Sequence, residues 1–230
     1  MLEKNLYSEH WTASGTAEKY KGKFKKKADR IRHKIEVKIL KKYAQGDLFD
    51  CSIGTGRFIK PLKTLVKTYS GMDYSPAFLI YINQHFPNAK TFQADLEKST
   101  GQSANYYDTT ICLRTIFALR NPGFIVSEMK RITQKGGLII FDYGKKERWH
   151  ERLKIKVNTA NVEKIITDNQ LKRMKIFKLD GLLGIVKKSD FLSRAFNSQY
   201  NIMPDAIYLL LEKISVLFFC KRKLYILLKI

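Results

Sequence analysis

Five short strand-like segments follow one another between residues 46 and 144, and helical segments separate most of them. This alternation constrains the fold more than any other feature of the sequence. Strands that are joined by helices pair in parallel, with right-handed crossovers and with helices covering both faces of the sheet. The predicted strands span residues 48–51, 69–73, 89–95, 108–113 and 138–142.

The rest of the chain extends this pattern. Apolar residues at helical spacing predict helices before the first strand (residues 18–43) and after it (57–67), and two more near the C-terminal end, over 159–171 and 190–218. Two further strands are predicted, at 174–179 and 224–229. We therefore expect an α/β domain over residues 46–230, with insertions at 145–172 and 188–220, preceded by a helical extension over 1–45.

The positive charge is unevenly distributed. The chain has 43 basic and 21 acidic residues, a formal net charge of +22. Residues 1–45 have 13 basic and 5 acidic residues (net +8), and residues 145–190 have 13 and 6 (net +7). Residues 46–144 are nearly balanced, with 11 and 8 (net +3). If the flanking segments surround a site in the middle, their charge attracts an anion.

Composition excludes several classes of protein. At 44% hydrophobic and 28% charged residues, the chain is neither disordered nor collagen-like. Its three cysteines are odd in number and have no CxxC spacing, which excludes a disulfide framework and argues against a cysteine zinc site. The start of the chain lacks a secretory signal, and no apolar run reaches the roughly 18 residues of a membrane span. We expect a cytoplasmic protein.

The apolar stretch from Ile207 to Phe219 needs a separate interpretation. We expect it to pack against the sheet, as apolar helices of such domains do. The basic run Lys221-Arg222-Lys223 directly after it also leaves a peripheral membrane contact open.

Glycines and aspartates mark the ends of the first three predicted strands. Gly54 and Gly56 follow the first strand, where the missing Cβ allows a ligand to approach the backbone. Asp73 ends the second strand, 17 residues after Gly56, and Asp95 ends the third, 22 residues further on. Because ligands of doubly wound sheets bind at the carboxyl ends of the strands, these residues predict a nucleotide-like site.

In this order and spacing, the motifs resemble those of the class I S-adenosylmethionine-dependent methyltransferases. The run from Asp50 to Gly56 resembles their glycine motif, with Ser52 in place of its first glycine. Gly71-Met72-Asp73-Tyr74-Ser75-Pro76 resembles their second motif, and Ala94-Asp95-Leu96 their adenine-binding turn. The resemblance implies a Rossmann-like, seven-stranded, mostly parallel sheet whose last strand is antiparallel.

The resemblance also implies the cofactor, S-adenosyl-L-methionine, and its contacts. Asp50, Ser52, Gly54 and the region of Thr55 would face the methionine end. Asp73 would hold the ribose, and Asp95 with Leu96 the adenine. The backbone around Leu113 would face the sulfonium. The full cofactor set is Asp50, Ser52, Gly54, Thr55, Gly56, Asp73, Tyr74, Asp95, Leu96, Leu113 and Tyr20.

The acceptor side lies beyond the fourth and fifth strands. Methyl transfer is an in-line displacement that needs alignment, and a hydroxyl or ammonium acceptor also needs a base. The candidate catalytic residues are Arg114, Asp142, Tyr143 and His150, with Arg114 as an anion clamp and His150 as the base. Tyr7, Trp11 and Tyr20 are candidates for a lid. We expect residues 1–45 and 145–190 to form the acceptor mouth.

The sequence has three alternative interpretations besides a small-molecule methyltransferase. A dehydrogenase fingerprint needs a third glycine where this chain has Ile59. The basic flanks permit an RNA acceptor, but residues 113–116 lack the Asn/Asp-Pro-Pro-aromatic motif of base-amine methyltransferases. A non-catalytic binding protein of the same fold is the third alternative. We therefore predict methyl transfer to an oxygen or nitrogen of a small anionic molecule, with an RNA methyltransferase as the alternative.

Overall fold

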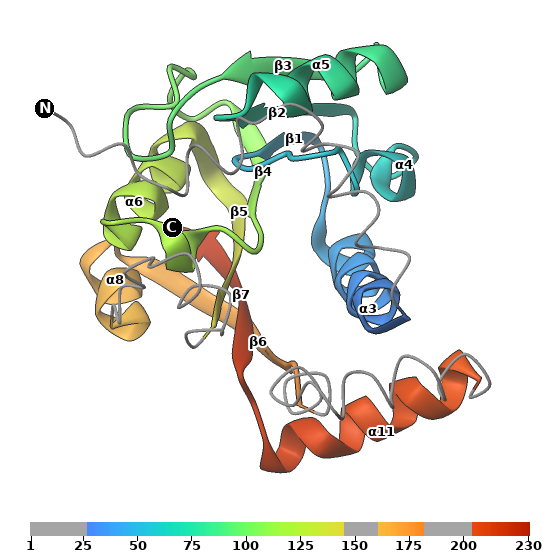
Figure 1. The fold of residues 1–230 in the computed structure, drawn as a ribbon. Coiled ribbons are helices and arrows are strands. Elements are labelled where there is room, and N and C mark those ends of the chain that lie inside the picture. Colours follow the sequence, from blue (N-terminus) through green and yellow to red (C-terminus); the bar gives the residue numbers. More distant parts are fainter. Residues whose placement is uncertain (1–26, 145–160, 182–203) are drawn as a thin grey trace, which may run out of the picture.

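The computed structural model describes residues 27–144, 161–181 and 204–230. These residues contain a sheet of seven strands, whose arrangement Figure 1 shows. The strand order is β3-β2-β1-β4-β5-β7-β6. The strands are β1 (Asp47–Asp50), β2 (Thr68–Asp73), β3 (Lys90–Gln93), β4 (Tyr107–Cys112), β5 (Thr133–Gly144), β6 (Leu171–Leu179) and β7 (Arg222–Lys229). All seven predicted strands are therefore confirmed.

The pairing directions also agree with the prediction. β1 pairs in parallel with β2 on one side and with β4 on the other. β7 runs antiparallel to both β5 and β6, which makes the last strand antiparallel in a mostly parallel sheet. The chain turns from one half of the sheet to the other between β1 and β4, and the carboxyl ends of parallel strands meet there. This switch point is where doubly wound sheets bind ligands.

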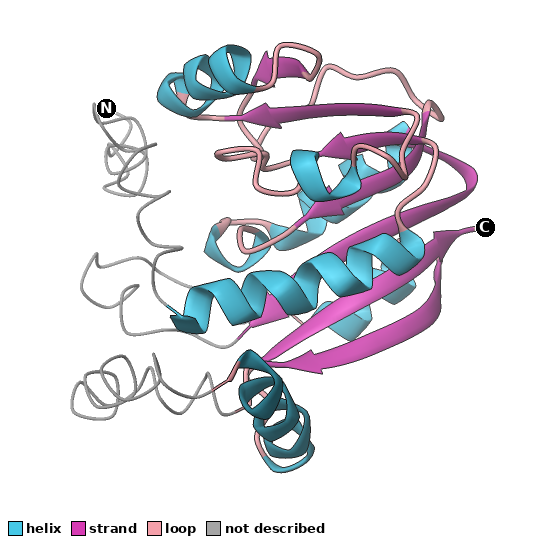
Figure 2. Ribbon diagram, turned by 90° about the vertical axis from the view of Figure 1, so that its right-hand side faces the viewer, coloured by secondary structure: helices cyan, strands magenta, loops and turns pink. Residues whose placement is uncertain are grey.

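Helices cover both faces of the sheet (Figures 1 and 2). They are α3 (Lys27–Tyr43), α4 (Ile59–Leu62), α5 (Pro76–His85), the 3-10 helix η1 (Ile116–Ala118), α6 (Pro122–Ile132), α8 (Val162–Asp168) and α11 (Asp205–Phe218). Figure 2 shows α3 lying along one face of the sheet. α4 and α5 share that core with α3, whereas α6 and α8 pack on the opposite face.

The two cores follow from side-chain alternation along the strands. Leu48 and Ile140 belong to the core under α3, while their neighbours Phe49 and Ile139 belong to the core under α6. Successive side chains of a strand point to opposite faces, so near-continuous apolar strands signal a sheet that is covered on both sides.

One predicted helix is much shorter in the structure. The helix expected over residues 57–67 is regular only in α4. After it, the Leu65 amide bonds to the Leu62 carbonyl at 2.8 Å, which tightens the last turn. The Lys67 amide donates to the Gly46 carbonyl at 2.8 Å and leads the chain back to the sheet beside β1. The predicted helix was too long, because the tight local turn and the tertiary bond between Lys67 and Gly46 end it.

The packing expected for the apolar C-terminal helix was also wrong. α11 lies along the bottom of the molecule in Figure 1 and does not cover a face of the sheet. Its buried residues are Tyr208, which packs on Ile31 of α3, and Glu212, whose carboxylate accepts a hydrogen bond from the Gly181 amide at 2.9 Å. Within the described residues, no helix combines the length and apolar character that crossing a bilayer requires.

Candidate functional site

The glycine turn after β1 folds against the end of β2. The Ile53 amide donates to the Met72 carbonyl at 3.0 Å, and the Gly54 amide donates to Oδ2 of Asp73 at 2.9 Å. The Cys51 amide donates to the Ile111 carbonyl of β4 at 2.8 Å. The turn therefore lies at the switch point of the sheet, where the sequence predicted it.

The glycines of this region serve different purposes. Gly54 has φ +53°, and a Cβ there would find only the Ser52 carbonyl oxygen, 3.9 Å away, so the space above it is open. Gly56 has φ +68°, but a Cβ would lie 2.6 Å from the Ile59 side chain. At Gly71 a Cβ would lie 2.7 Å from the Asp50 carbonyl oxygen. Gly54 thus leaves room for a ligand, whereas Gly56 and Gly71 allow close packing.

The Asp73 carboxylate is held in one orientation by the backbone. Besides Gly54, the Ser75 amide donates to it, to Oδ1 at 3.0 Å. Burial raises the pKa of Asp73 to about 6, although the amides of Ser75 and Gly54 act in the opposite direction. The Tyr74 amide also bonds to this carboxylate. Because a carboxylate has about four acceptor sites, these three bonds leave capacity for a ribose hydroxyl. The oriented acceptor and the open space at Gly54 fit a nucleoside.

Asp50 is turned toward the protein. Its oxygens accept hydrogen bonds from the Ser52 amide at 3.0 Å and from the Tyr69 hydroxyl at 2.9 Å. Burial raises the pKa of Asp50 to about 6, against the effect of both bonds. Asp50 therefore shapes the glycine turn, and its predicted role at the methionine end of the cofactor stays a prediction.

The other predicted cofactor residues lie around the same edge. Oδ1 of Asp95 accepts a bond from the Glu97 amide at 2.9 Å, and the Ala94 amide donates to the Asp73 carbonyl at 3.2 Å. The Ser52 hydroxyl is 3.8 Å from the Cys112 sulfur at the end of β4. Tyr74 is exposed, Leu96 is half-buried, and Thr55 and Leu113 are buried. Tyr20 lies outside the described residues.

Arg114, which was predicted to lie on the acceptor side, forms an ion pair with a glutamate of helix α3. Its Nε and Nη2 donate to the two carboxylate oxygens of Glu36, on α3, at 3.0 and 2.9 Å. Its backbone has φ +66°, and its amide donates to Oδ1 of Asp142 at 2.6 Å. Arg114 was predicted as an anion clamp, and that role would require its guanidinium to exchange Glu36 for the ligand.

Arg114 belongs to a larger set of buried charges, which we call the buried ion network. Glu36 also accepts from Arg57 at 2.5 Å and lies 2.7 Å from Nη2 of Arg222. The four arginines and four acids of the network cancel in formal charge. They are Arg32, Arg57, Arg114, Arg222, Asp29, Glu36, Asp142 and Asp180.

Protonation in the buried ion network follows from this arrangement. Burial by itself would raise the pKa of Glu36, but Arg114, Arg57 and Arg222 outweigh it and hold that pKa well below its usual range. Burial raises the pKa of Asp142, although its ion pair with Arg222 opposes the shift. With both oxygens bonded and its side chain fully buried, Asp142 orients Arg114 and Arg222.

Most of this network was missed by the sequence analysis. A signal existed, because Arg32 and Glu36 are one turn apart on α3, beside the apolar stripe that contains Ile39. Charged residues next to a buried stripe need partners, but the sequence does not show which ones. Arg222 and Asp180 come from β7 and the end of β6, far along the chain.

His33 of α3 lies next to this network. Its ring packs against Phe58 with 5.4 Å between centroids. Burial, together with the positive charge of Arg57, lowers the pKa of His33 to about 4. The ring is therefore neutral near pH 7.

The remaining predicted catalytic residues are only partly placed. Tyr143 is half-buried near the end of β5, packed against the core under α6. His150 lies outside the described residues, as do Tyr7 and Trp11. No group of three or more His, Cys, Asp or Glu side chains among residues 27–144, 161–181 and 204–230 is placed to hold a metal ion. Cys51 and Cys112 are buried free thiols.

Comparison with known proteins gives a family for the central segment. Residues 49–141 match the family model of a methyltransferase domain. No curated protein matches the chain. A chain of the complex between the Trm112 methyltransferase activator and a methyltransferase of Haloferax volcanii has a TM-score of 0.66 at 14% identity, with 96% of each chain covered.

Two other solved structures are similar. A possible histamine N-methyltransferase of Thermotoga maritima has a TM-score of 0.59 at 18% identity, over 76% of this chain and 83% of that one. The geranyl diphosphate C-methyltransferase of Streptomyces coelicolor has a TM-score of 0.60 at 13% identity, over 86% and 78%. At such identities the likeness shows the fold.

The fold and the glycine turn define a Rossmann-like nucleotide-binding protein. The matched segment spans β1 to β5 and includes the turn, Asp73 and Asp95. Residues 49–141 thus belong to a methyltransferase domain, and the chain has the fold of the class I S-adenosylmethionine-dependent methyltransferases.

Proposed function

We propose that this methyltransferase transfers the methyl group to an oxygen or nitrogen of a small anionic molecule. The observation that supports cofactor binding is the hydrogen bond from the Gly54 amide to Asp73. It holds a carboxylate that can accept a ribose hydroxyl next to the open space at Gly54. S-adenosylmethionine supplies an electrophilic methyl group on a sulfonium. The protein then has to align the acceptor and exclude water.

Different residues at the strand ends bind different parts of the cofactor. Asp73 accepts a ribose hydroxyl, and Asp95 with Leu96 holds the adenine. Gly54 lets the turn approach the cofactor. At the end of β4, the backbone of Leu113 lies on the sulfonium side, and Arg114 after it is held by Asp142 and Glu36.

Charge supports an anionic acceptor. The buried ion network is neutral overall, so its arginines contribute little net attraction at long range. The attraction comes from the flanking segments 1–45 and 145–190, with net charges of +8 and +7. The Streptomyces coelicolor neighbour, whose structure holds geranyl diphosphate, illustrates a small anion on this fold. His150 remains the proposed base.

RNA is the second candidate acceptor. One observation favours it, because the edge strand β6 exposes four basic side chains, Lys172, Arg173, Lys175 and Lys178. These side chains lie on both faces of an edge strand, and exposed basic residues at a sheet edge suit contact with a phosphate backbone. We prefer the small molecule because the sequence lacks a base-amine motif after the fourth strand and shows no separate RNA-binding module.

Two measurements test the proposal. In calorimetry with S-adenosylhomocysteine, Asp73→Asn should bind about tenfold or more weakly, since a charge-assisted hydrogen bond contributes about 1.5–3 kcal/mol. Asp168→Asn, an exposed carboxylate on α8, is the matched control. Equal binding by both variants would contradict the Asp73 assignment.

The acceptor is tested with methyl-labelled cofactor against metabolite extracts and total RNA. Label in a small anionic product supports the proposal, whereas label in RNA supports the alternative. Cofactor binding without label in either pool would identify a non-catalytic binding protein.

A further inference from the structure

The outward face of α11 is apolar along its whole length. The exposed fractions are 46% for Ile207, 57% for Leu210, 49% for Ile214, 70% for Leu217 and 76% for Phe218. These residues recur at steps of three and four, so they form one stripe, which Leu211 joins at 37%. We call these six residues the α11 stripe. Exposed apolar residues are common singly, but a continuous stripe on a helix marks a contact surface.

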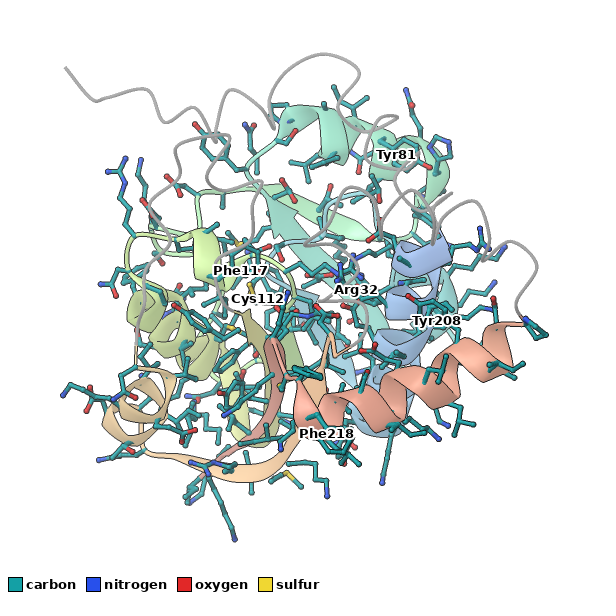
Figure 3. The ribbon with its side chains drawn as sticks, turned by 60° about the horizontal axis from the view of Figure 1, so that its bottom comes forward. Arg32, Tyr81, Cys112, Phe117, Tyr208 and Phe218 are labelled. Atoms are coloured by element: carbon teal, nitrogen blue, oxygen red, sulfur yellow. The ribbon has the colours of Figure 1, made fainter. Side chains whose placement is uncertain are left out.

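The opposite side of α11 fixes this orientation. Tyr208 packs on Ile31 of α3, and Glu212 accepts the Gly181 amide at 2.9 Å. A Cβ on Gly181 would lie 2.6 Å from the Val216 amide nitrogen, so the chain after β6 packs directly on the helix. Figure 3 shows Tyr208 on the side of α11 next to α3 and Phe218 on the other side. The stripe therefore points away from the domain.

Basic side chains cluster at the end of α11 where the stripe is most exposed. Lys213 is exposed on the helix itself, and Lys221 and Lys223 follow it in the chain. Lys223 is paired in register with the exposed Lys178 of β6. Phe219, just past the helix, is 55% exposed. The most accessible apolar side chains and four lysines thus lie at one end of the element.

We propose that α11 docks on an anionic lipid surface, with the α11 stripe in the headgroup region and the lysines around it at the level of the phosphates. Apolar insertion and electrostatic attraction are the two contributions that together hold a peripheral helix on a membrane. The chain's net charge of +22 adds to the attraction. This surface does not depend on which acceptor is methylated.

Charge also decides against a second copy as the occupant. Pairing two copies through this end would bring their lysines together, in a chain whose net charge is already +22. A helix of 14 residues is about 21 Å long, so the stripe alone offers less contact than the roughly 800 Å² per partner of a standard stable interface. Lipid phosphates neutralise the same lysines and need no second protein surface.

The test is cosedimentation of the full chain with vesicles. We expect binding to vesicles of equimolar phosphatidylcholine and phosphatidylglycerol, and weak binding to phosphatidylcholine alone. Leu217→Ser/Phe218→Ser should lower the partition coefficient by about tenfold or more, because two large apolar side chains no longer insert. The matched control is Leu65→Ser/Ile80→Ser, at positions that are 44% and 59% exposed elsewhere on the surface.

Charge is tested separately from apolar contact. Lys213→Glu/Lys223→Glu should weaken binding more than Lys90→Glu/Lys98→Glu, which changes the net charge equally at exposed positions away from α11. An equal loss of vesicle binding in both variants would overturn the proposal, since it would show that only the total charge of the chain attracts it to the vesicles. The proposal would also be overturned if Leu217→Ser/Phe218→Ser bound vesicles as well as the unsubstituted chain does.

Two other results would identify a different occupant. A dimer in light scattering that Leu217→Ser/Phe218→Ser dissociates, without vesicle binding, would assign the stripe to a second copy. A lower melting temperature in that variant, again without vesicle binding, would mean that the chain itself covers the stripe. Both results would overturn the membrane proposal.

Discussion

The guanidinium of Arg114 donates two hydrogen bonds to the carboxylate of Glu36, a residue 78 positions earlier in the chain. This pair joins helix α3 to the loop after β4, on the side of the site where we propose that the acceptor binds. Since Glu36 also pairs with Arg57 next to the glycine turn, one carboxylate of α3 connects the glycine turn after β1 with the loop after β4. The geometry of the site therefore depends on a helix outside the matched segment, which covers residues 49–141.

Neutralising Glu36 should be strongly destabilising. In Glu36→Gln, three arginines lose the fully buried anion that they share, and removing one partner of a buried ion pair costs about 3–5 kcal/mol in the free energy of unfolding. Urea denaturation measures this loss. Glu163→Gln, which breaks a half-exposed pair with Arg173, should change stability by less than about 1 kcal/mol. Similar losses in both variants would contradict the central position of Glu36.

Adding a methyl group at Gly54 should impair cofactor binding more than folding. Gly54 and Gly136 both have positive φ, at +53° and +78°, and neither Cβ would meet another atom within 3.4 Å. Each substitution by alanine should therefore cost about 1–2 kcal/mol of stability. Only Gly54→Ala should lose affinity for S-adenosylhomocysteine in calorimetry, because its Cβ would project into the proposed site. Unchanged affinity in Gly54→Ala would place the cofactor elsewhere.

Cofactor affinity should depend on pH through Asp73. The pKa of its carboxyl is raised by burial to about 6. A ribose needs the ionised form, so binding releases a proton below that pH. The association constant should be constant above about pH 7 and fall by up to about tenfold for each pH unit below 6. Calorimetric titrations of S-adenosylhomocysteine between pH 5 and 8 measure the association constant. Asp73→Asn should bind weakly, and its association constant should not fall in this way below pH 6. A fall that persists in Asp73→Asn would assign the titration to another group.

Stability should fall on mild acidification because of His33. Its pKa is about 4 in the folded protein, lowered by burial from 6.5. Between these values the unfolded chain binds the proton and the folded protein does not. The contribution of this group is therefore fully present above pH 6.5 and is lost as the pH falls toward 4. We expect a loss of about 1–2 kcal/mol between pH 7.5 and 5 from this group.

The difference between His33→Gln and the natural chain isolates this effect. His33→Gln should lose less stability on acidification than the natural chain does, as measured by urea unfolding at the two pH values. His85→Gln, at an exposed ring on α5, should follow the natural chain. If the free energy of unfolding had the same pH dependence in the natural chain and in His33→Gln, the folded protein would bind the His33 proton as readily as the unfolded chain does, and the prediction would be wrong.

The elements that the sequence predicted well share one property, which is local patterning. All seven strands and the positions of Gly54, Gly56 and Asp73 follow from apolar runs, turn residues and strand-to-helix spacing. The helix expected over 57–67 was too long because its end is set by a bond from Lys67 to Gly46, which helical periodicity does not register.

The sequence by itself determined the succession of strands and helices along the chain, the glycine turn and the aspartates at the strand ends. These features depend on residues that are close together in the chain. Only the tertiary structure decided that Glu36 binds Arg114, that Tyr69 donates to Asp50, and that the stripe of α11 points outward. The physical reason is distance. Ion pairs and burial depend on which elements the sheet order places side by side. The residues that meet there lie far apart in the chain, as Arg32 and Asp180 do at a separation of 148 positions.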